Sequence, residues 1–180
     1  MSKLPALLAA VIGLSLLIAG CGKAVDDNAG KGPTPAVQGV DADGTMHPGA
    51  SDRCPVCGMT VHDRKFPASL TLKDGRTFYF CGPGCLIRTW TDPATHLGVS
   101  ADALLAARAT DYFTGKSLDA NEAFWIFGSD VKGPMGPMPV AVSDEAEAET
   151  FKKRHGAKTT FRLKDMTAEK WQALRASAAP

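Results

Sequence analysis

The sequence predicts an α+β fold, with two ββαβ units forming one compact pseudo-repeat behind a signal peptide and a flexible linker. Two observations predict it: the order strand, strand, helix, strand is read twice, and turn-forming Gly, Pro and Asp residues separate the runs. The expected divisions are a lipoprotein signal peptide at 1–20, a lipid anchor and disordered linker at 21–52, a first unit with the cysteine pairs at 53–118, and a second unit with a methionine loop and tail helix at 119–180.

The N-terminus has the pattern of a bacterial secretion signal. Lys3 precedes an apolar run that ends in Leu-Ile-Ala-Gly before Cys21. The run is shorter than the ~20 apolar residues that span a bilayer, so we interpret it as a signal peptide. Its end resembles a lipobox, which predicts lipidation of Cys21; the alternative is a plain secretory cleavage site with an incidental cysteine. We expect a lipid-anchored protein on the periplasmic face of a bacterial membrane, and Gly22 slightly favours the outer membrane.

The stretch from 21 to 52 is rich in Gly, Pro, Ala and Asp and lacks apolar periodicity, which predicts disorder. Within it, Met46 and His47 are both residue types that bind copper, although they also suit an ordinary linker. The whole chain has 20 basic and 19 acidic residues. This balance gives no indication of nucleic-acid binding. As a separate expectation, the protein is a monomer.

In the first unit, alternation over 68–72, an Asp74-Gly75 turn and the run 77–80 predict a β-hairpin. The chain then turns at Cys81 into a short helix, about 84–89. Two further elements are expected: an alanine-rich helix at 100–109 and a returning strand at 111–114.

In the second unit, apolar runs predict strands at 123–127 and 138–142. Ser143-Asp144 is a good N-cap, and acidic residues early with basic residues late match the helix dipole until His155-Gly156. A strand at 159–163 and a helix at 168–177 complete the unit.

Two close cysteine pairs carry the chemistry. Cys54 and Cys57, with Met59 beside them, form one short loop, and Cys81 and Cys85 form a second. Thiolates with a thioether select Cu(I), whereas thiolates alone also suit Zn or Fe–S clusters. Met135 lies in a Gly/Pro-rich loop where packing does not require a methionine, so it is a further candidate ligand.

Four interpretations of the cysteines remain open. They are a closed four-thiolate zinc site, two disulfides favoured by an oxidising compartment, a Cu(I) site that uses some thiolates with methionine, and a thioredoxin-like redox pair. The last is weak, because Cys-x-x-Cys here precedes a hairpin and does not open a helix. No arrangement of residues suggests catalysis, so we do not expect an enzyme.

The motifs also resemble a known family. Cys-Pro-Val-Cys-Gly-Met, then Phe-Tyr-Phe-Cys-Gly-Pro-Gly-Cys, and above all Gly-Ser-Asp-Val-x-Gly-Pro-Met-Gly at 128–136 resemble the nitrous oxide reductase accessory lipoproteins, the NosL family. The first half also looks like metal-binding modules of the YHS or TRASH type. The resemblance covers about residues 53–166.

The resemblance implies a periplasmic, lipid-anchored protein that binds Cu(I) one-to-one. It also implies that the protein supplies copper to nitrous oxide reductase, with that enzyme or its ABC-type maturation complex as partner. Cys57, Met59 and Met135 match the family motifs, which leads to the hypothesis of a Cys57/Met135 core assisted by Met59 or Cys54. The Cys81/Cys85 pair departs from many members and leaves a separate zinc or copper role open.

Overall fold

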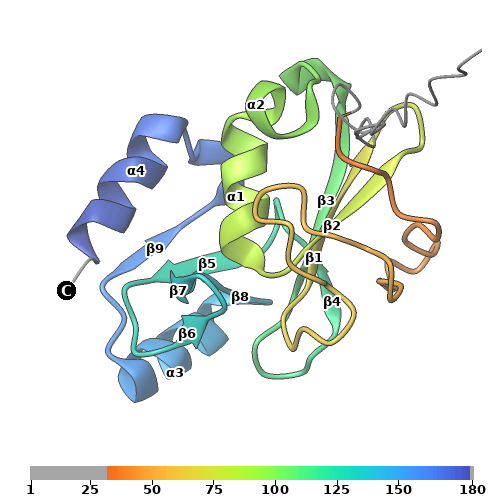
Figure 1. Cartoon of the computed structure of the whole chain (residues 1–180). Coiled ribbons are helices and arrows are strands. Elements are labelled where there is room, and N and C mark those ends of the chain that lie inside the picture. Colours follow the sequence, from red (N-terminus) through yellow and green to blue (C-terminus); the bar gives the residue numbers. More distant parts are fainter. Residues whose placement is uncertain (1–31, 179–180) are drawn as a thin grey trace, which may run out of the picture. The chain divides into compact units, whose positions relative to one another are not determined.

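The computed structural model describes residues 32–178, so the predicted signal peptide and Cys21 lie outside the described residues. In chain order the elements are β1 (Ala68–Leu72), β2 (Thr77–Phe80), α1 (Pro83–Thr91), α2 (Pro93–Leu97), the 3-10 turn η1 (Ala101–Ala103), β3 (Leu104–Thr110), β4 (Ser117–Asp119), β5 (Phe124–Phe127), β6 (Lys132–Gly133), β7 (Gly136–Pro137), β8 (Val140–Val142), α3 (Glu145–His155), β9 (Thr159–Phe161), the 3-10 turn η2 (Leu163–Asp165) and α4 (Ala168–Ser177). Strand, strand, helix, strand occurs as β1-β2-α1-β3 and again as β5-β8-α3-β9, which confirms the predicted α+β class (Figure 1). Between residues 32 and 178, no helix has the length and apolar character needed to cross a bilayer.

The first sheet has the strand order β2-β1-β3-β4, and all its neighbours are antiparallel. The predicted hairpin is confirmed: Thr71 pairs with Thr77, and Gly75 in the turn between them has a φ of 89°, which favours glycine. Helix α1 packs on β1 and β2 with one face and contacts α4 with another (Figure 1). The end of β2 and the start of α1 are thereby held together.

Two predictions in the first unit are wrong. Residues 100–109 form η1 and strand β3, not a helix, because Ala107 and Ala109 are fully buried in a strand that lies between β1 and β4. Tertiary packing there outweighs the helix propensity of alanine. The expected strand at 111–114 is a turn, since the Asp111 carboxylate accepts hydrogen bonds from the backbone N–H groups of Phe113 and Thr114 at 2.9 and 2.7 Å.

The second sheet has the order β8-β5-β9, again antiparallel. Strand β5 is buried on both faces: Trp125 and Phe127 belong to the main core, whereas Ile126 belongs to a smaller cluster with Phe151 of α3. One parallel bridge between Asp111 and Ala141 connects the two sheets. The two units therefore share a core.

The helices of the second unit match their predictions. Asp144 caps α3 by accepting a hydrogen bond from the Glu147 N–H at 2.8 Å, and Gly156 ends the helix with a φ of 65°. Helix α4 occupies the predicted span, and its Trp171 packs against Phe127 with ring centroids 5.2 Å apart.

Residues 32–52 differ from the disordered linker predicted there. The Ala36 N–H donates to the Thr77 carbonyl at 2.8 Å, so this segment contacts the free edge of β2. The buried Tyr79 hydroxyl donates to the Gly39 carbonyl at 2.8 Å and accepts from the His47 N–H at 3.0 Å. The segment is ordered by contacts with a distant strand, which its own composition does not reveal.

Candidate metal centre

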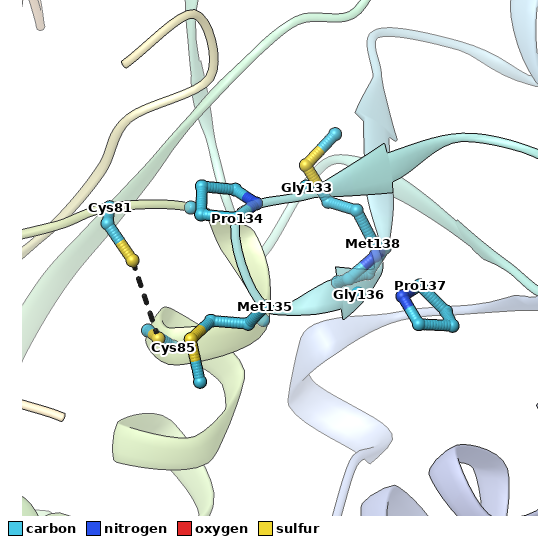
Figure 2. Close-up of a pocket in the computed structure, with 11 residues that line it drawn as sticks. Cys81, Cys85, Gly133, Pro134, Met135, Gly136, Pro137 and Met138 are labelled. Atoms are coloured by element: carbon cyan, nitrogen blue, oxygen red, sulfur yellow. Dashed lines mark hydrogen bonds between the residues drawn. The ribbon is translucent and has the colours of Figure 1, made fainter. Parts of the chain in front are cut away.

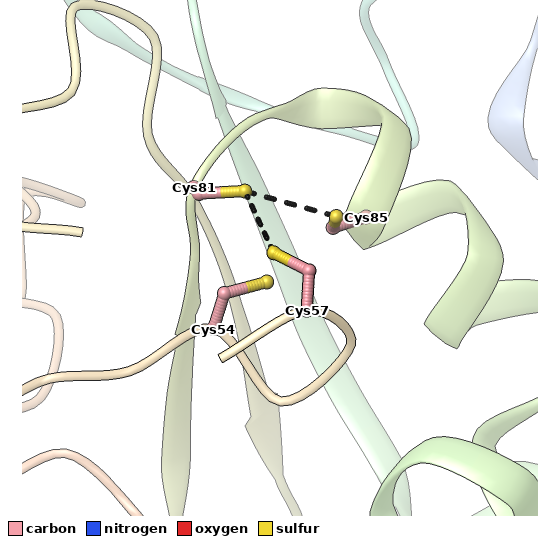
Figure 3. Close-up of side chains that lie close together, drawn as sticks. All are labelled: Cys54, Cys57, Cys81 and Cys85. Atoms are coloured by element: carbon pink, nitrogen blue, oxygen red, sulfur yellow. Dashed lines mark hydrogen bonds between the residues drawn. The ribbon is translucent and has the colours of Figure 1, made fainter. Parts of the chain in front are cut away.

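The sulfur atoms of Cys54, Cys57, Cys81 and Cys85 all lie within 4.8 Å of one another (Figure 3). Cys57 Sγ is 3.4 Å from Cys81 Sγ, which is 3.8 Å from Cys85 Sγ. A tetrahedral metal with metal–sulfur bonds of about 2.3 Å would place its sulfurs about 3.8 Å apart. All four cysteines are free thiols, and their spacing suits the coordination sphere of one soft metal ion.

A tight turn forms the first corner of this cluster. The Cys54 N–H donates to the Met59 carbonyl at 2.9 Å, and the Gly58 N–H donates to the Cys54 carbonyl at 2.8 Å. Gly58 has a φ of 71°, a left-handed conformation that glycine adopts without strain. The turn brings the sulfurs of Cys54 and Cys57 to one side, where they meet the second corner.

The second corner joins a strand to a helix. Cys81 directly follows β2, and Cys85 lies in the first turn of α1, where Pro83 occupies a starting position that suits proline. Cys54, Cys81 and Cys85 are each at most 3% exposed, whereas Cys57 is half-buried. Cys57 is thus the member of the cluster most open to solvent.

Interactions among the thiols shift their pKa values in opposite directions. The pKa of Cys54 is lowered, because the thiols of Cys81 and Cys85 donate to its sulfur. The pKa values of Cys81 and Cys85 are raised, first through their hydrogen bonds with Cys54 and also by burial. This coupling follows from the close spacing of the four sulfur atoms.

The predicted methionine loop is the tip of the β6–β7 hairpin. Pro134 and Met135 connect the paired residues Gly133 and Gly136, and Met135 is 50% exposed. Its side chain reaches toward Cys85 across a small pocket of about 30 Å³ that Cys81 also lines (Figure 2). The structure thus brings a thioether beside the second cysteine pair, and Cys57 is not among the walls of this pocket.

The remaining candidate residues have other contacts. Met59 contributes its carbonyl to the first turn, and its half-buried side chain packs against the main core; its role as a ligand remains a prediction. Met46 packs against the same core. His47 Nε2 lies 2.7 Å from an Asp41 carboxylate oxygen, and the metal-ligand group found among residues 32–178 contains no histidine.

Three cationic residues beside the cysteine cluster were not identified from the sequence. Arg64, Lys65 and Lys132 line a groove that also includes Cys81. Lys132 is far from the other two in the chain and lies in β6, so no local motif marks the set. These three residues become neighbours only in the folded chain, so the sequence alone gives no signal that they form a set.

Comparisons with known proteins place the chain in a family. The family model described as NosL matches residues 45–171. The copper-binding lipoprotein NosL of Stutzerimonas stutzeri is 25% identical over 118 residues, which span 60% of this chain and 58% of that protein. The crystal structure of the copper chaperone NosL from Shewanella denitrificans shares the fold, with a TM-score of 0.59 and 21% identity over 69% of this chain and 96% of that chain. The chain belongs to the NosL family.

Proposed function

We propose that this protein is a Cu(I)-binding metallochaperone, anchored through Cys21 to the periplasmic face of a bacterial membrane. We propose that it supplies copper for the maturation of nitrous oxide reductase, with that enzyme or its ABC-type maturation complex as partner. The names of its relatives, a copper-binding lipoprotein and a copper chaperone, support the proposal. The observation that supports this proposal most strongly is that the four thiols converge on one place and that Met135 lines a pocket with two of them, Cys81 and Cys85.

Charge favours a low-coordinate copper site within this cluster. Four thiolates around Cu(I) would leave a net charge of −3 in a largely buried site, where unbalanced charge is costly. Two thiolates with a neutral thioether would leave only −1, and this soft set suits Cu(I). Cys81, Cys85 and Met135 are such a set, because they line one pocket.

Cys57 completes this proposal as an exchanging ligand. It is half-buried and its sulfur is 3.4 Å from that of Cys81, so it could bind the ion as another ligand leaves. This arrangement retains Cys57 and Met135 from the hypothesis based on the family motifs. A carrier needs such exchange, since its ion must leave without unfolding the protein.

A second candidate function has its own observation. The sulfur spacing fits a closed tetrahedral zinc site, in which four thiolates and Zn²⁺ would carry −2. In that case the protein would be a scaffold or a general heavy-metal binder with zinc as a structural ion. Chelation of zinc would then unfold the domain, and copper would have little effect.

Metal analysis of the protein purified anaerobically from the periplasm distinguishes the copper chaperone from the zinc-containing scaffold. The chaperone predicts one Cu(I) per chain, removed by a strong Cu(I) chelator while the fold persists. The scaffold predicts one zinc per chain, with far-UV circular dichroism lost when zinc is removed. A protein that holds neither metal and binds no added Cu(I) under reducing conditions would contradict the proposed function.

Variants test the ligand set. Met135→Leu should weaken Cu(I) binding by at least about tenfold in a chelator competition, since losing a ligand should cost no less than losing an outer-shell partner. Met166→Leu is the matched control, because Met166 is buried and does not line the pocket. Equal affinities of Met135→Leu and the control would remove Met135 from the site, and an unchanged affinity in Cys57→Ser would remove Cys57.

A further inference from the structure

We propose that a cationic groove beside the cluster is the docking surface for an acidic protein segment that exchanges copper with Cys81. The groove encloses about 320 Å³, and Arg64, Lys65 and Lys132 contribute to its walls together with Cys81. The inference rests on the proposed function for the identity of the transferred ion. The groove itself, and the charge of its partner, follow from the contacts of these side chains.

The groove and the metal pocket share walls. Cys81, Gly133, Pro134 and Met138 line both hollows, so the β6–β7 hairpin and one cysteine separate them. A partner segment in the groove would therefore lie against Cys81, which also lines the metal pocket. Cys81 is only 2% exposed, so an incoming sulfur ligand would approach it from this groove.

The charge of the groove is predominantly positive. Its walls include three cationic residues and one acidic residue, Asp63. In the part of the chain that the structure describes, Arg64, Lys65 and Lys132 form no ion pair with a carboxylate. Unpaired cations around a recess attract anionic partners and speed their encounter.

Two of the cations are held in place by other contacts. Arg64 Nε donates to the Thr60 carbonyl at 3.0 Å, and Lys65 Nζ lies 5.1 Å from the centre of the Phe66 ring. Both residues also line a larger neighbouring hollow, whose walls add one further cationic residue, Lys116, and one acidic residue, Asp43. The cationic surface thus continues past the groove, which suits an extended acidic segment.

The transfer step is a ligand exchange. A partner thiol forms a bond to Cu(I) as the bond from Cu(I) to Cys81 breaks, and the thiol proton passes to the released Cys81 sulfur. Copper stays in the +1 state, so no oxidant or reductant is required. The partner must therefore present a soft sulfur ligand beside its acidic residues.

The test uses the full mature chain and two synthetic peptides. Both peptides carry one Cys-x-x-Cys pair, flanked by glutamates in one and by lysines in the other. Peptide binding is measured first on metal-free reduced protein by fluorescence anisotropy, and Cu(I) transfer is then followed by stopped flow. The test variant is Lys65→Glu/Lys132→Glu. The matched control is Lys73→Glu/Lys164→Glu, two exposed lysines outside the groove.

We expect the glutamate peptide to bind and to receive copper faster than the lysine peptide. The test variant should slow that transfer by about tenfold at low salt, and the difference should shrink as salt rises. The affinity for Cu(I) should stay unchanged in both variants, and the control should transfer Cu(I) to the glutamate peptide at the native rate. Equal binding of both peptides, or an equal loss in the control, would overturn the docking surface whether or not copper binds. If the test variant loses binding to phosphatidylglycerol vesicles while its copper transfer to the glutamate peptide is unchanged, the cations bind the membrane. That result would also overturn the proposed docking surface.

Discussion

Replacing Tyr79 with phenylalanine removes one oxygen atom that holds residues 39–47 against the first sheet. The hydroxyl donates to the Gly39 carbonyl and accepts from the His47 N–H, at 2.8 and 3.0 Å. The ring is 2% exposed, and phenylalanine would fill the same space. The substitution therefore tests the two hydrogen bonds with little change in packing.

The expected loss follows from those two bonds. Each intramolecular hydrogen bond contributes about 0.5–1.5 kcal/mol net, so Tyr79→Phe should lower the free energy of unfolding by about 1–3 kcal/mol. Tyr112→Phe is the matched control, since the Tyr112 hydroxyl has a single hydrogen bond, to His155 at 3.2 Å. The control should lose about half as much or less.

Urea unfolding followed by circular dichroism measures the loss, and hydrogen exchange with mass spectrometry locates it. We expect faster exchange of amides between residues 36 and 47 in Tyr79→Phe and no such change in Tyr112→Phe. A stability equal to that of the native protein, with unchanged exchange in this segment, would refute the conclusion that Tyr79 holds it.

Three further predictions concern stability. Burial raises the pKa of Tyr79, so its contribution to stability is complete below about pH 10 and is lost as pH rises further, because the unfolded state ionises first. In urea titrations, the stability gap between the native protein and Tyr79→Phe should therefore stay constant up to about pH 9 and narrow above about pH 10. Asp144→Ala should cost about 1 kcal/mol by freeing the Glu147 N–H, and an unchanged urea midpoint would contradict the capping role. Gly58→Ala should cost about 1–2 kcal/mol because its φ is 71°, whereas Gly82→Ala, at an extended φ of 176° with open space around it, should cost much less in the same assay.

Local signals in the sequence predicted the elements that local chemistry controls. The Asp74-Gly75 turn indicated the hairpin, and the Asp144 cap with Gly156 bounded α3, because turns and caps depend on neighbouring residues. The alanine-rich stretch at 100–109 was misassigned, since its conformation depends on pairing with β1, more than 30 residues earlier in the chain. The order of residues 39–47 likewise depends on Tyr79, 32 residues beyond His47.

The candidate site was predicted in part for the same reason. Short spacing indicated that each cysteine pair forms one corner, and the hairpin between them explained how the corners meet. Which cysteines Met135 approaches depends on how the second unit packs on the first, and no periodicity carries that information. The family motifs suggested Cys57 as its partner, whereas Met135 lines a pocket with Cys81 and Cys85.

X-ray absorption at the copper edge of the Cu(I)-loaded chain tests the central claim most directly. The account predicts one Cu(I) per chain with a first shell made only of sulfur, and a shell altered by Cys81→Ser, Cys85→Ser or Met135→Leu. A shell dominated by nitrogen or oxygen, or a spectrum that none of these substitutions changes, would contradict it.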